Sequence, residues 1–388
     1  MRLPNRDLCT GCGGCAAACP KGCIRMEADA EGFLYPRVDQ SQCVDCKKCE
    51  QTCAVLHKPA VGESVQAWAT RNTDSDVRSE SSSGGVFTAL AKCVIGDGGA
   101  VCAAVYTEDW TVVHKIAFTV EALAAMRGAK YVQSHAGHLF ARLKSLLTEG
   151  KPVMFVGTPC QCAGLKAYLG QDYERLILVD MVCHGVPAPS VWKAYVRRRR
   201  ELDANGAELM SVNLRDKSTG WSRYAYSVKF QYANGSAYCV PQGQDPYMRG
   251  FVGDLYLRPS CSACSFKGIS RCSDLTLGDC WGIWDSHPDF DDNRGTSLLL
   301  VHTAKGQQIW NRLCADFGSV AFAVEDVTKY NPSAVSESRA HASRGEFFRR
   351  LSEGEKVDVL IGAVLSPKVP RQSFLKRVVR RILGRHST

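Results

Sequence analysis

Eight of the twenty cysteines form two runs of identical spacing within the first 53 residues. Each run has two gaps of two residues and then one gap of three, and Pro20 follows the first run. This spacing is typical of two cubane [4Fe-4S] clusters, in which the fourth cysteine of each run binds the other cluster. Zinc sites or a disulfide framework are alternatives, but a zinc ion needs only four ligands and does not require such runs. The predicted ligands, which imply one-electron transfer, are Cys9, Cys12, Cys15, Cys19, Cys43, Cys46, Cys49 and Cys53.

A second set of cysteines lies far from these runs. Cys160 and Cys183 each follow a predicted buried strand, and Cys261 and Cys264 form a CxxC pair. Because the carboxyl ends of neighbouring parallel strands meet at one sheet edge, we predict a third cluster bound by Cys160, Cys183, Cys261 and Cys264. A zinc site and a local set made of Cys261, Cys264, Cys272 and Cys280 are alternatives. A cysteine nucleophile beside His184 has no orienting partner in the sequence.

Clusters carry single electrons, so a chain that also handles hydride needs a cofactor such as a flavin. A Ser/Gly loop that precedes a predicted helix is the candidate phosphate cradle, because helix N-termini and glycine amides suit phosphate. The same residues also simply cap helices. A second polar group offers Lys130 for a phosphate and Tyr131 for ring stacking, with a surface turn as the alternative. The candidate cofactor-binding residues are Ser81, Ser82, Ser83, Gly84, Gly85, Lys130 and Tyr131.

The elements that would position these residues fall into four predicted segments. Residues 1–58 form a ferredoxin-like module, 64–150 a flavin-binding domain, 151–330 a domain with the additional cluster, and 331–388 a helical segment with a basic tail. Strands over 153–157 and 176–180, each followed by a turn, and a helix to residue 169 predict a parallel α/β layer. Residues 212–214, 224–232 and 238–240 alternate like antiparallel strands. The predicted fold class is therefore α+β or α/β and multidomain, with a mixed α/β body.

The net charge of +9 is concentrated at the C-terminal end, where residues 367–388 hold seven basic residues and no acid. The body therefore gives no indication of nucleic-acid binding. Phe374, Leu375, Val378, Val379, Ile382 and Leu383 alternate with these charges as in an amphipathic helix, which indicates peripheral membrane contact or packing on the body or a second subunit. No apolar stretch of ~18 residues predicts a spanning helix. Abundant cysteine without a secretory segment indicates a cytoplasmic protein.

Taken together, these segments resemble the family of coenzyme F420 hydrogenase/dehydrogenase beta subunits, here joined to a 2[4Fe-4S] ferredoxin domain. The resemblance covers about residues 1 to 330 and is carried by the stretches 81–87, 128–134, 157–161, 183–187, 258–264 and 278–282. It implies FAD at the Ser/Gly loop and a cluster in the body. It also implies hydride exchange with a 5-deazaflavin, although relatives of this layout serve other substrates. Cys162 and Cys272 are extra thiols close to the predicted body cluster.

The sequence thus predicts a flavin- and iron–sulfur-dependent oxidoreductase. It would pass electrons between a hydride carrier, such as coenzyme F420 or another organic substrate, and a one-electron partner such as a ferredoxin or another redox protein. A non-catalytic adaptor that feeds a separate enzyme, for instance in surface-polysaccharide synthesis, is the competing interpretation. A third is a metal-binding structural protein without flavin. Substrate, direction of electron flow, partner and oligomeric state do not follow from these motifs.

Overall fold

The computed structural model describes residues 2–62 and 64–366, so the predicted basic tail helix lies outside the described residues. Its strands are β1 (Ile24–Ala28), β2 (Leu34–Val38), β3 (Gln66–Asn72), β4 (Ala100–Tyr106), β5 (Val112–Ala117), β6 (Val153–Val156), β7 (Leu176–Met181), β8 (Leu209–Asp216), β9 (Ser227–Tyr232), β10 (Ala237–Pro241), β11 (Leu275–Asp279), β12 (Ser297–Val301) and β13 (Phe317–Ala321). Its α-helices are α1 (Gly14–Ala17), α2 (Lys48–Gln51), α3 (Ser75–Ser79), α4 (Val86–Gly96), α5 (Phe140–Thr148), α6 (Pro159–Leu169), α7 (Pro189–Ala204), α8 (Pro246–Val252), α9 (Ile283–Ser286), α10 (Ala304–Leu313), α11 (Val324–Tyr330), α12 (Arg344–Ser352) and α13 (Val357–Leu365).

An eight-stranded mixed sheet forms the centre of the body, in the order β13-β3-β12-β11-β7-β6-β4-β5. The strands β11, β7, β6 and β4 run parallel, which confirms the predicted α/β layer. Antiparallel strands flank this parallel centre on both sides. Strand β3, which precedes residue 150, lies between β13 and β12, which follow it, and β4 pairs with β6. The two predicted body segments therefore share one sheet and one core.

Helices cover both faces of the large sheet, as expected where central strands are buried on both sides. The helices α4 and α10 pack on one face through side chains such as Leu90 and Trp310. On the other face, α5 and α6 pack through Phe140 and Leu165 against β6 and β7. All five residues of β12 are buried, which explains why four of them are Leu or Val. This packing fixes the carboxyl ends of β6, β7 and β11 relative to one another.

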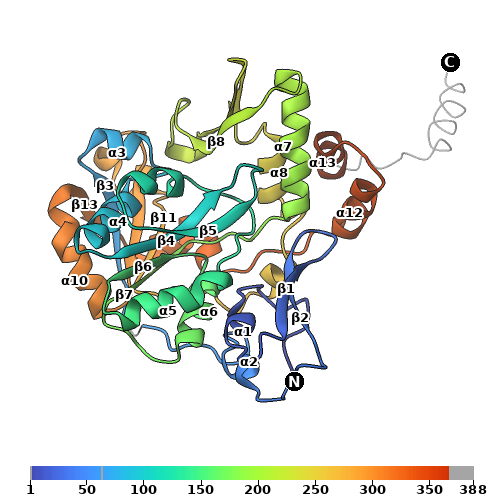
Figure 1. The fold of residues 1–388 in the computed structure, drawn as a ribbon. Coiled ribbons are helices and arrows are strands. Elements are labelled where there is room, and N and C mark those ends of the chain that lie inside the picture. The colour runs from blue at the N-terminus through green and yellow to red at the C-terminus, as the bar shows by residue number, and fades with distance from the viewer. Residues whose placement is uncertain (1, 63, 367–388) are drawn as a thin grey trace, which may run out of the picture.

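A smaller antiparallel sheet, β10-β9-β8, stands beside the large one (Figure 1). Its inner face packs with α7 and α8 in an aromatic core that contains Trp192, Tyr195, Phe230 and Tyr247. The C-terminal helix α13 packs against α7 and α8, and α12 packs against α13. This second layer closes one side of the space above the large sheet.

The N-terminal module consists of the β1–β2 hairpin with α1 and α2, and it lies against α6 (Figure 1). Buried Arg258 attaches it to the body by donating from Nε to the Cys9 carbonyl at 2.9 Å and from Nη2 to the Leu34 carbonyl at 2.9 Å. The Arg344 guanidinium of α12 pairs with Glu31 in the hairpin turn. The module is thus held from two sides.

Most of the strands and helices expected from the sequence are present, and the mixed α/β fold class is confirmed. The β1–β2 hairpin and the edge strand β13 were not predicted, because their mixed polar and apolar residues give a weak periodic signal. Residues Glu121–Met126 form a 3₁₀ helix. Within the described ranges, no helix has the length and apolar character needed to cross a membrane.

Candidate functional site: thiol groups beside a large cavity

Four thiols from both N-terminal runs form the first group: Cys9, Cys12, Cys15 and Cys53. The short helices α1 and α2 pack together, which brings Cys15 in α1 close to Cys53, just after α2. Burial, together with the charges of Cys9 and Cys53, raises the pKa of Cys12 to about 11 and also raises the pKa of Cys15. Buried thiols of this kind keep their protons unless a cation replaces them, which is the environment that iron binding uses.

The second N-terminal group contains Cys19, Cys43, Cys46 and Cys49, which line one small cavity. The fourth cysteine of each run therefore lies with the first three of the other run. Cys23, to which the sequence assigned no role, lines the same cavity, and its Sγ lies 3.3 Å from that of Cys19. Cys46 is exposed, so this group reaches the surface of the module.

The third group lies in the body, where Cys160, Cys183, Cys261 and Cys264 line a single small cavity. Cys160 starts α6 after β6, and Cys183 follows the neighbouring parallel strand β7. Burial raises the pKa of Cys160, Cys183 and Cys261 to about 12. The Val186 amide donates to Cys261 Sγ at 3.4 Å, the kind of backbone contact that tunes a cluster thiolate.

The alternative ligand set is not brought together. Cys280 is fully buried in the aromatic core, and neither it nor Cys272 lines the third thiol cavity. Cys162 is also fully buried and points its thiol at the Val179 carbonyl. His184 has a partner that the sequence did not indicate, since its Nε2 lies 2.7 Å from Asp254 Oδ1. The raised pKa of Cys183 nevertheless disfavours a nucleophilic thiolate there.

Zinc is the other alternative for these thiol groups. A zinc ion draws its ligands to within about 2.0–2.3 Å of one point. Among residues 2–62 and 64–366, no three His, Cys, Asp or Glu side chains lie close enough to hold one metal ion. Thiols spread around a cavity instead suit a cluster in which each thiolate binds a different iron atom.

A cavity of about 800 Å³ opens above the carboxyl ends of the parallel strands. Ser81, Ser82, Ser83 and Gly85 line it, as do Lys130 and Tyr131, so the two predicted polar clusters meet in one place. Gly84 does not line the cavity. A Cβ on Gly84 would meet the Thr70 carbonyl oxygen and lie 2.7 Å from the Ser297 amide, so this glycine lets the loop pack on the large sheet.

The serine hydroxyls of the loop already have partners. Ser81 Oγ donates to the Val77 carbonyl at 2.6 Å, and Ser83 Oγ donates to the Thr296 carbonyl at 2.8 Å. Ser82 Oγ accepts from the Ala129 amide at 2.8 Å, which leaves its own proton available to a ligand. Two of the three hydroxyls therefore shape the loop, and Ser82 with the N-terminus of α4 faces the cavity.

Lys130 does not offer a free ammonium group for a phosphate. Its Nζ donates to the carbonyls of Met126, Arg127 and Gly128 at 3.3, 2.7 and 3.1 Å, so it closes the turn over 126–130. Burial lowers the pKa of Lys130 to about 7. Arg127 lines the cavity beside it with Nε lacking a partner, and its Nη1 pairs with Glu80. Arg127 is a better-placed cation, and no motif in the sequence marked it.

Two charged residues and a wall of aromatic rings were also missed. Arg215 of β8 and Asp279 at the end of β11 line the cavity, with Arg215 Nη2 2.7 Å from Asp279 Oδ2. The Trp221 and Trp281 rings stack with centroids 4.6 Å apart, and Tyr224 lies 4.6 Å from Trp281. Asp279 and Trp281 fall within the stretch 278–282, which signalled the family but no function. Tyr131, predicted to stack on a ring, itself stacks on Phe251 at 4.7 Å.

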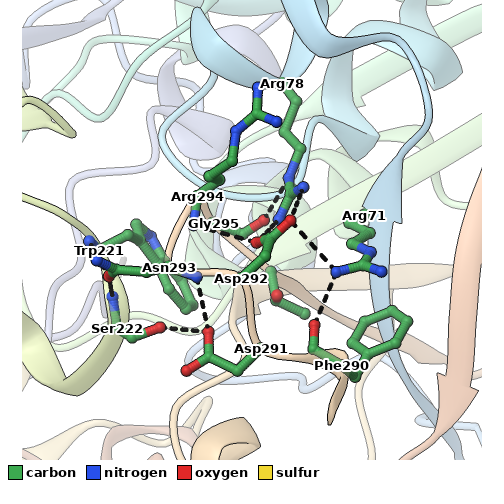
Figure 2. Close-up of polar contacts among 12 residues, drawn as sticks. Arg71, Arg78, Trp221, Ser222, Phe290, Asp291, Asp292, Asn293, Arg294 and Gly295 are labelled. Carbon is green, nitrogen blue, oxygen red and sulfur yellow. Dashed lines mark hydrogen bonds and ion pairs between the residues drawn. The ribbon is translucent and has the colours of Figure 1, made fainter. Parts of the chain in front are cut away.

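A polar network connects Arg78 of α3, the helix before the serine loop, to Trp221 of this aromatic wall (Figure 2). Buried Arg78, at the end of α3, donates from Nη1 to Asp292 Oδ2 at 2.6 Å and from Nε to the Gly295 carbonyl at 2.8 Å. The next residue, Asn293, accepts at Oδ1 from the amides of Trp221 and Ser222, both at 2.8 Å. The loop over 291–295 therefore fixes the distance between the two sides of the cavity.

The cavities adjoin one another. Cys160 and Thr10 both line the third thiol cavity and the large cavity. On the other side, the charge of Cys12 acts on Cys160. Gly164 of α6 permits this approach, because a Cβ there would lie 2.8 Å from both Cβ and Sγ of Cys12. The sites therefore follow one another from the large cavity to the third, first and second thiol groups.

Comparisons with known proteins give matches in the same order along the chain. Residues 8–56 match a 4Fe-4S dicluster domain, residues 67–140 match the N-terminal part of the coenzyme F420 hydrogenase/dehydrogenase beta subunit, and residues 150–320 match its C-terminal part. One subunit of the F420H2 dehydrogenase of Methanosarcina mazei is 26% identical over 222 residues, which are 55% of this chain and 61% of that protein. This chain therefore spans about three-fifths of that curated relative.

Two other similar proteins are a sequence relative and a chain of known structure. An uncharacterized protein of Methanocaldococcus jannaschii is 26% identical over 347 residues, or 79% of this chain and 87% of that protein. Among solved structures, a chain of the F420-reducing [NiFe] hydrogenase complex from Methanosarcina barkeri has a TM-score of 0.46 at 18% identity, covering 76% of this chain and 96% of that one.

The three family matches confirm the resemblance drawn from the short sequence stretches. The two beta-subunit matches cover the strands of the large sheet from β3 to β13, and the dicluster match covers the N-terminal module. The chain belongs to the family of coenzyme F420 hydrogenase/dehydrogenase beta subunits and carries an N-terminal 4Fe-4S domain.

Proposed function

We propose that this chain is an oxidoreductase in which FAD in the large cavity exchanges hydride with a deazaflavin such as coenzyme F420, or with another organic two-electron carrier. Three [4Fe-4S] clusters, one per thiol group, would link that site to a redox partner protein. The observation that carries the proposal is the position of Cys160, which borders both the large cavity and the third thiol cavity. A two-electron site and a one-electron site would then share a wall.

The residues of the large cavity fit a flavin nucleotide. Its volume of about 800 Å³ is at the upper end of ligand pockets, which usually measure about 300–1,000 Å³. The N-terminus of α4, the free proton of Ser82 and the Arg127 guanidinium suit phosphate oxygens. Aromatic rings, including Tyr131 and Trp281, suit a planar ring system. A bound flavin supplies two-electron chemistry toward an organic carrier and one-electron chemistry toward a cluster.

The protein's own contribution is to bind, orient and exclude water. Tyr131, stacked on Phe251, and Trp281, stacked on Trp221, provide apolar walls. His114 stays neutral, because burial lowers its pKa to about 4. Its Nε2 donates to the Val156 carbonyl at 2.9 Å, so its Nδ1 accepts the Ser134 hydroxyl proton at 2.6 Å. His114 therefore adds no charge to this wall of the cavity.

The composition of the purified protein tests the proposal. The full chain, isolated without oxygen, is expected to contain about twelve irons and twelve sulfides, given four of each per cubane, together with one FAD. Ser82→Phe should lose the flavin and keep the iron, because the ring would fill the cradle. Ser79→Phe is the matched control, since Ser79 lies in the same segment and is exposed. Full iron without flavin in the unmodified protein would contradict the flavin assignment.

A second assay separates the enzyme from an adaptor. The unmodified protein is mixed with reduced coenzyme F420 and an artificial one-electron acceptor such as methyl viologen, and the deazaflavin absorbance is followed. An enzyme oxidises the deazaflavin in many turnovers without any other subunit. A protein that reduces its clusters with dithionite yet never reacts with F420 or with any other hydride carrier is an adaptor, and the hydride-transfer proposal then fails.

A further inference from the structure

One charged pair in the large cavity is left unused by the proposed chemistry. The side chain of Arg215 is 3% exposed, and its Nη2 lies 2.7 Å from Asp279 Oδ2. Neither Nε nor Nη2 of Arg215 makes a hydrogen bond of good geometry. Asp279 is more open, with 20% of its side chain exposed. The pair therefore holds unused donors and an accessible acceptor side by side in the wall of a ligand-sized cavity.

Rings surround the pair on several sides. The Arg215 guanidinium carbon lies 3.8 Å from the centroid of the Tyr226 ring and 5.0 Å from that of Trp281. Tyr131 acts electrostatically on Arg215, so its phenol is close as well. Rings around a guanidinium group fix the orientation of its plane. This favours a flat ligand that approaches in the same plane.

The charge balance argues against a phosphate at this point. Arg215 carries one positive charge and Asp279 one negative charge, so the pair is neutral overall. Arginine only donates hydrogen bonds, and an ionised aspartate only accepts them. The complementary ligand is a neutral edge with an acceptor next to a donor. In a pyrimidinedione ring, the imide edge has this order, with a carbonyl oxygen adjacent to an N–H.

We propose that Arg215 and Asp279 recognise the imide edge of a flavin-type ring, Arg215 donating to a ring carbonyl and Asp279 accepting from the ring N–H. This inference rests on the proposed function, because it concerns the ligand of the same cavity. Isoalloxazine and 5-deazaflavin rings share the imide edge. The pair thus selects flavin-type rings over planar aromatic molecules of similar size that lack an imide edge.

Hydrogen bonds hold the serine loop, residues 81–85, in a fixed position relative to this pair. Ser83, beside Asp279, donates to the Thr296 carbonyl, and Lys217, next to the end of β8, donates from Nζ to the Ser83 carbonyl at 2.7 Å. Trp221 Nε1 donates to the Ser82 carbonyl at 3.2 Å. The serine loop, the charged pair and the aromatic wall therefore form one rigid frame, which is what in-plane recognition of a ring edge requires.

The test uses lumiflavin and N3-methyllumiflavin, in which a methyl group replaces the imide proton, as fluorescent probes. Affinities are measured by fluorescence quenching with the full chain after its own flavin has been dialysed away. The unmodified chain should bind lumiflavin about 10–100-fold more tightly, because the methyl group removes the N–H from which Asp279 would accept a hydrogen bond. In the double variant Arg215→Met with Asp279→Leu, the two probes should bind within about threefold of each other.

Replacing both partners with apolar side chains of similar volume keeps the core filled, and thermal unfolding checks that the variant folds. The matched control is Arg312→Met with Asp97→Leu. These two residues form an exposed pair with contacts of 2.9 and 3.0 Å, and this double variant should retain the full preference for lumiflavin. A second arm uses the FAD-loaded chain with a 5-deazaflavin and its N3-methyl form. A preference seen only in this arm assigns the pair to the incoming carrier, and one seen only in the dialysed chain assigns it to the resident flavin.

The outcomes distinguish the role of the pair from the function of the cavity. Equal binding of methylated and unmethylated probes in both arms overturns the role of Arg215 and Asp279 and leaves the proposed function standing. Absence of binding by any flavin or deazaflavin in both arms overturns the proposed function and this inference with it.

Discussion

Arg258→Met should uncouple the N-terminal module from the body. Arg258 is 2% exposed and makes three hydrogen bonds, to the Cys9 and Leu34 carbonyls at 2.9 Å each and to Gln133 Oε1 at 2.6 Å. Its guanidinium carbon also lies 4.2 Å from the centroid of the Tyr35 ring. One side chain therefore connects the backbone of a cluster ligand, the module hairpin and the wall of the large cavity.

The expected loss can be estimated from these contacts. A hydrogen bond from a charged donor contributes about 1.5–3 kcal/mol. Removing the guanidinium also recovers its burial cost, so the net loss of docking free energy is about 3–5 kcal/mol. Each 1.4 kcal/mol is about a factor of ten, so the docking equilibrium should weaken by more than about 100-fold.

The assay is a rapid-mixing measurement of electron transfer from the reduced cavity cofactor to an oxidised ferredoxin. Arg258→Met should transfer electrons much more slowly, and a protease should cut residues 57–62 more rapidly. Arg249→Met is the control, because Arg249 is exposed on neighbouring α8. If the variant transfers electrons within threefold of the unmodified rate although proteolysis shows a released module, the path through Cys12 and Cys160 is wrong.

Three further predictions concern single positions. Cys183→Ala should reduce the iron content by about four atoms per chain, whereas Cys272→Ala should keep all of it; a loss in the second variant, measured by iron analysis, would restore the alternative ligand set. Gly164→Leu should destabilise the chain by about 1–3 kcal/mol, because its side chain would overlap Cys12 and push the module off α6. Thermal unfolding is compared with that of Gly170→Leu, where a Cβ meets no atom within 4 Å but φ is +71°. That variant shows the effect of backbone strain without the overlap. Burial lowers the pKa of His114 to about 4, so between pH 6.5 and 4 the unfolded chain binds a proton that the folded chain does not, and the free energy of unfolding should fall by about 3 kcal/mol across that window. His114→Gln should remove this part of the acid sensitivity in denaturant titrations, and an unchanged slope would show that His114 is not neutral in the fold.

Local patterns in the sequence were enough for the elements that carry a strong periodic or spacing signal. The two cysteine runs indicate their cluster ligands because a cubane needs thiolates at fixed short spacings. The buried strands β6 and β7 are marked by short apolar stretches, and the turns after them gave Cys160 and Cys183 as candidates that meet in one cavity. The family resemblance rests on several such short stretches in a fixed order.

The functions of individual polar residues could not be read in the same way. Lys130 is a plausible phosphate ligand in sequence, but the turn over 126–130 folds three carbonyl oxygens onto its ammonium group. Arg127, three residues earlier, has the same charge and keeps an unpartnered Nε beside the cavity. Which of two nearby cations faces a ligand depends on the backbone path, and the sequence contains no local signal for that path.

By itself, then, the sequence determined the N-terminal 4Fe-4S domain, the mixed α/β class and the family, because each depends on short-range spacing. Only the tertiary structure decided which residues share the large cavity. Arg215 and Asp279 are 64 residues apart and come from different sheets, and they meet because the fold brings β8 of the small sheet to the end of β11 in the large sheet. Long-range packing of buried strands and helices creates that proximity, and no local pattern encodes it.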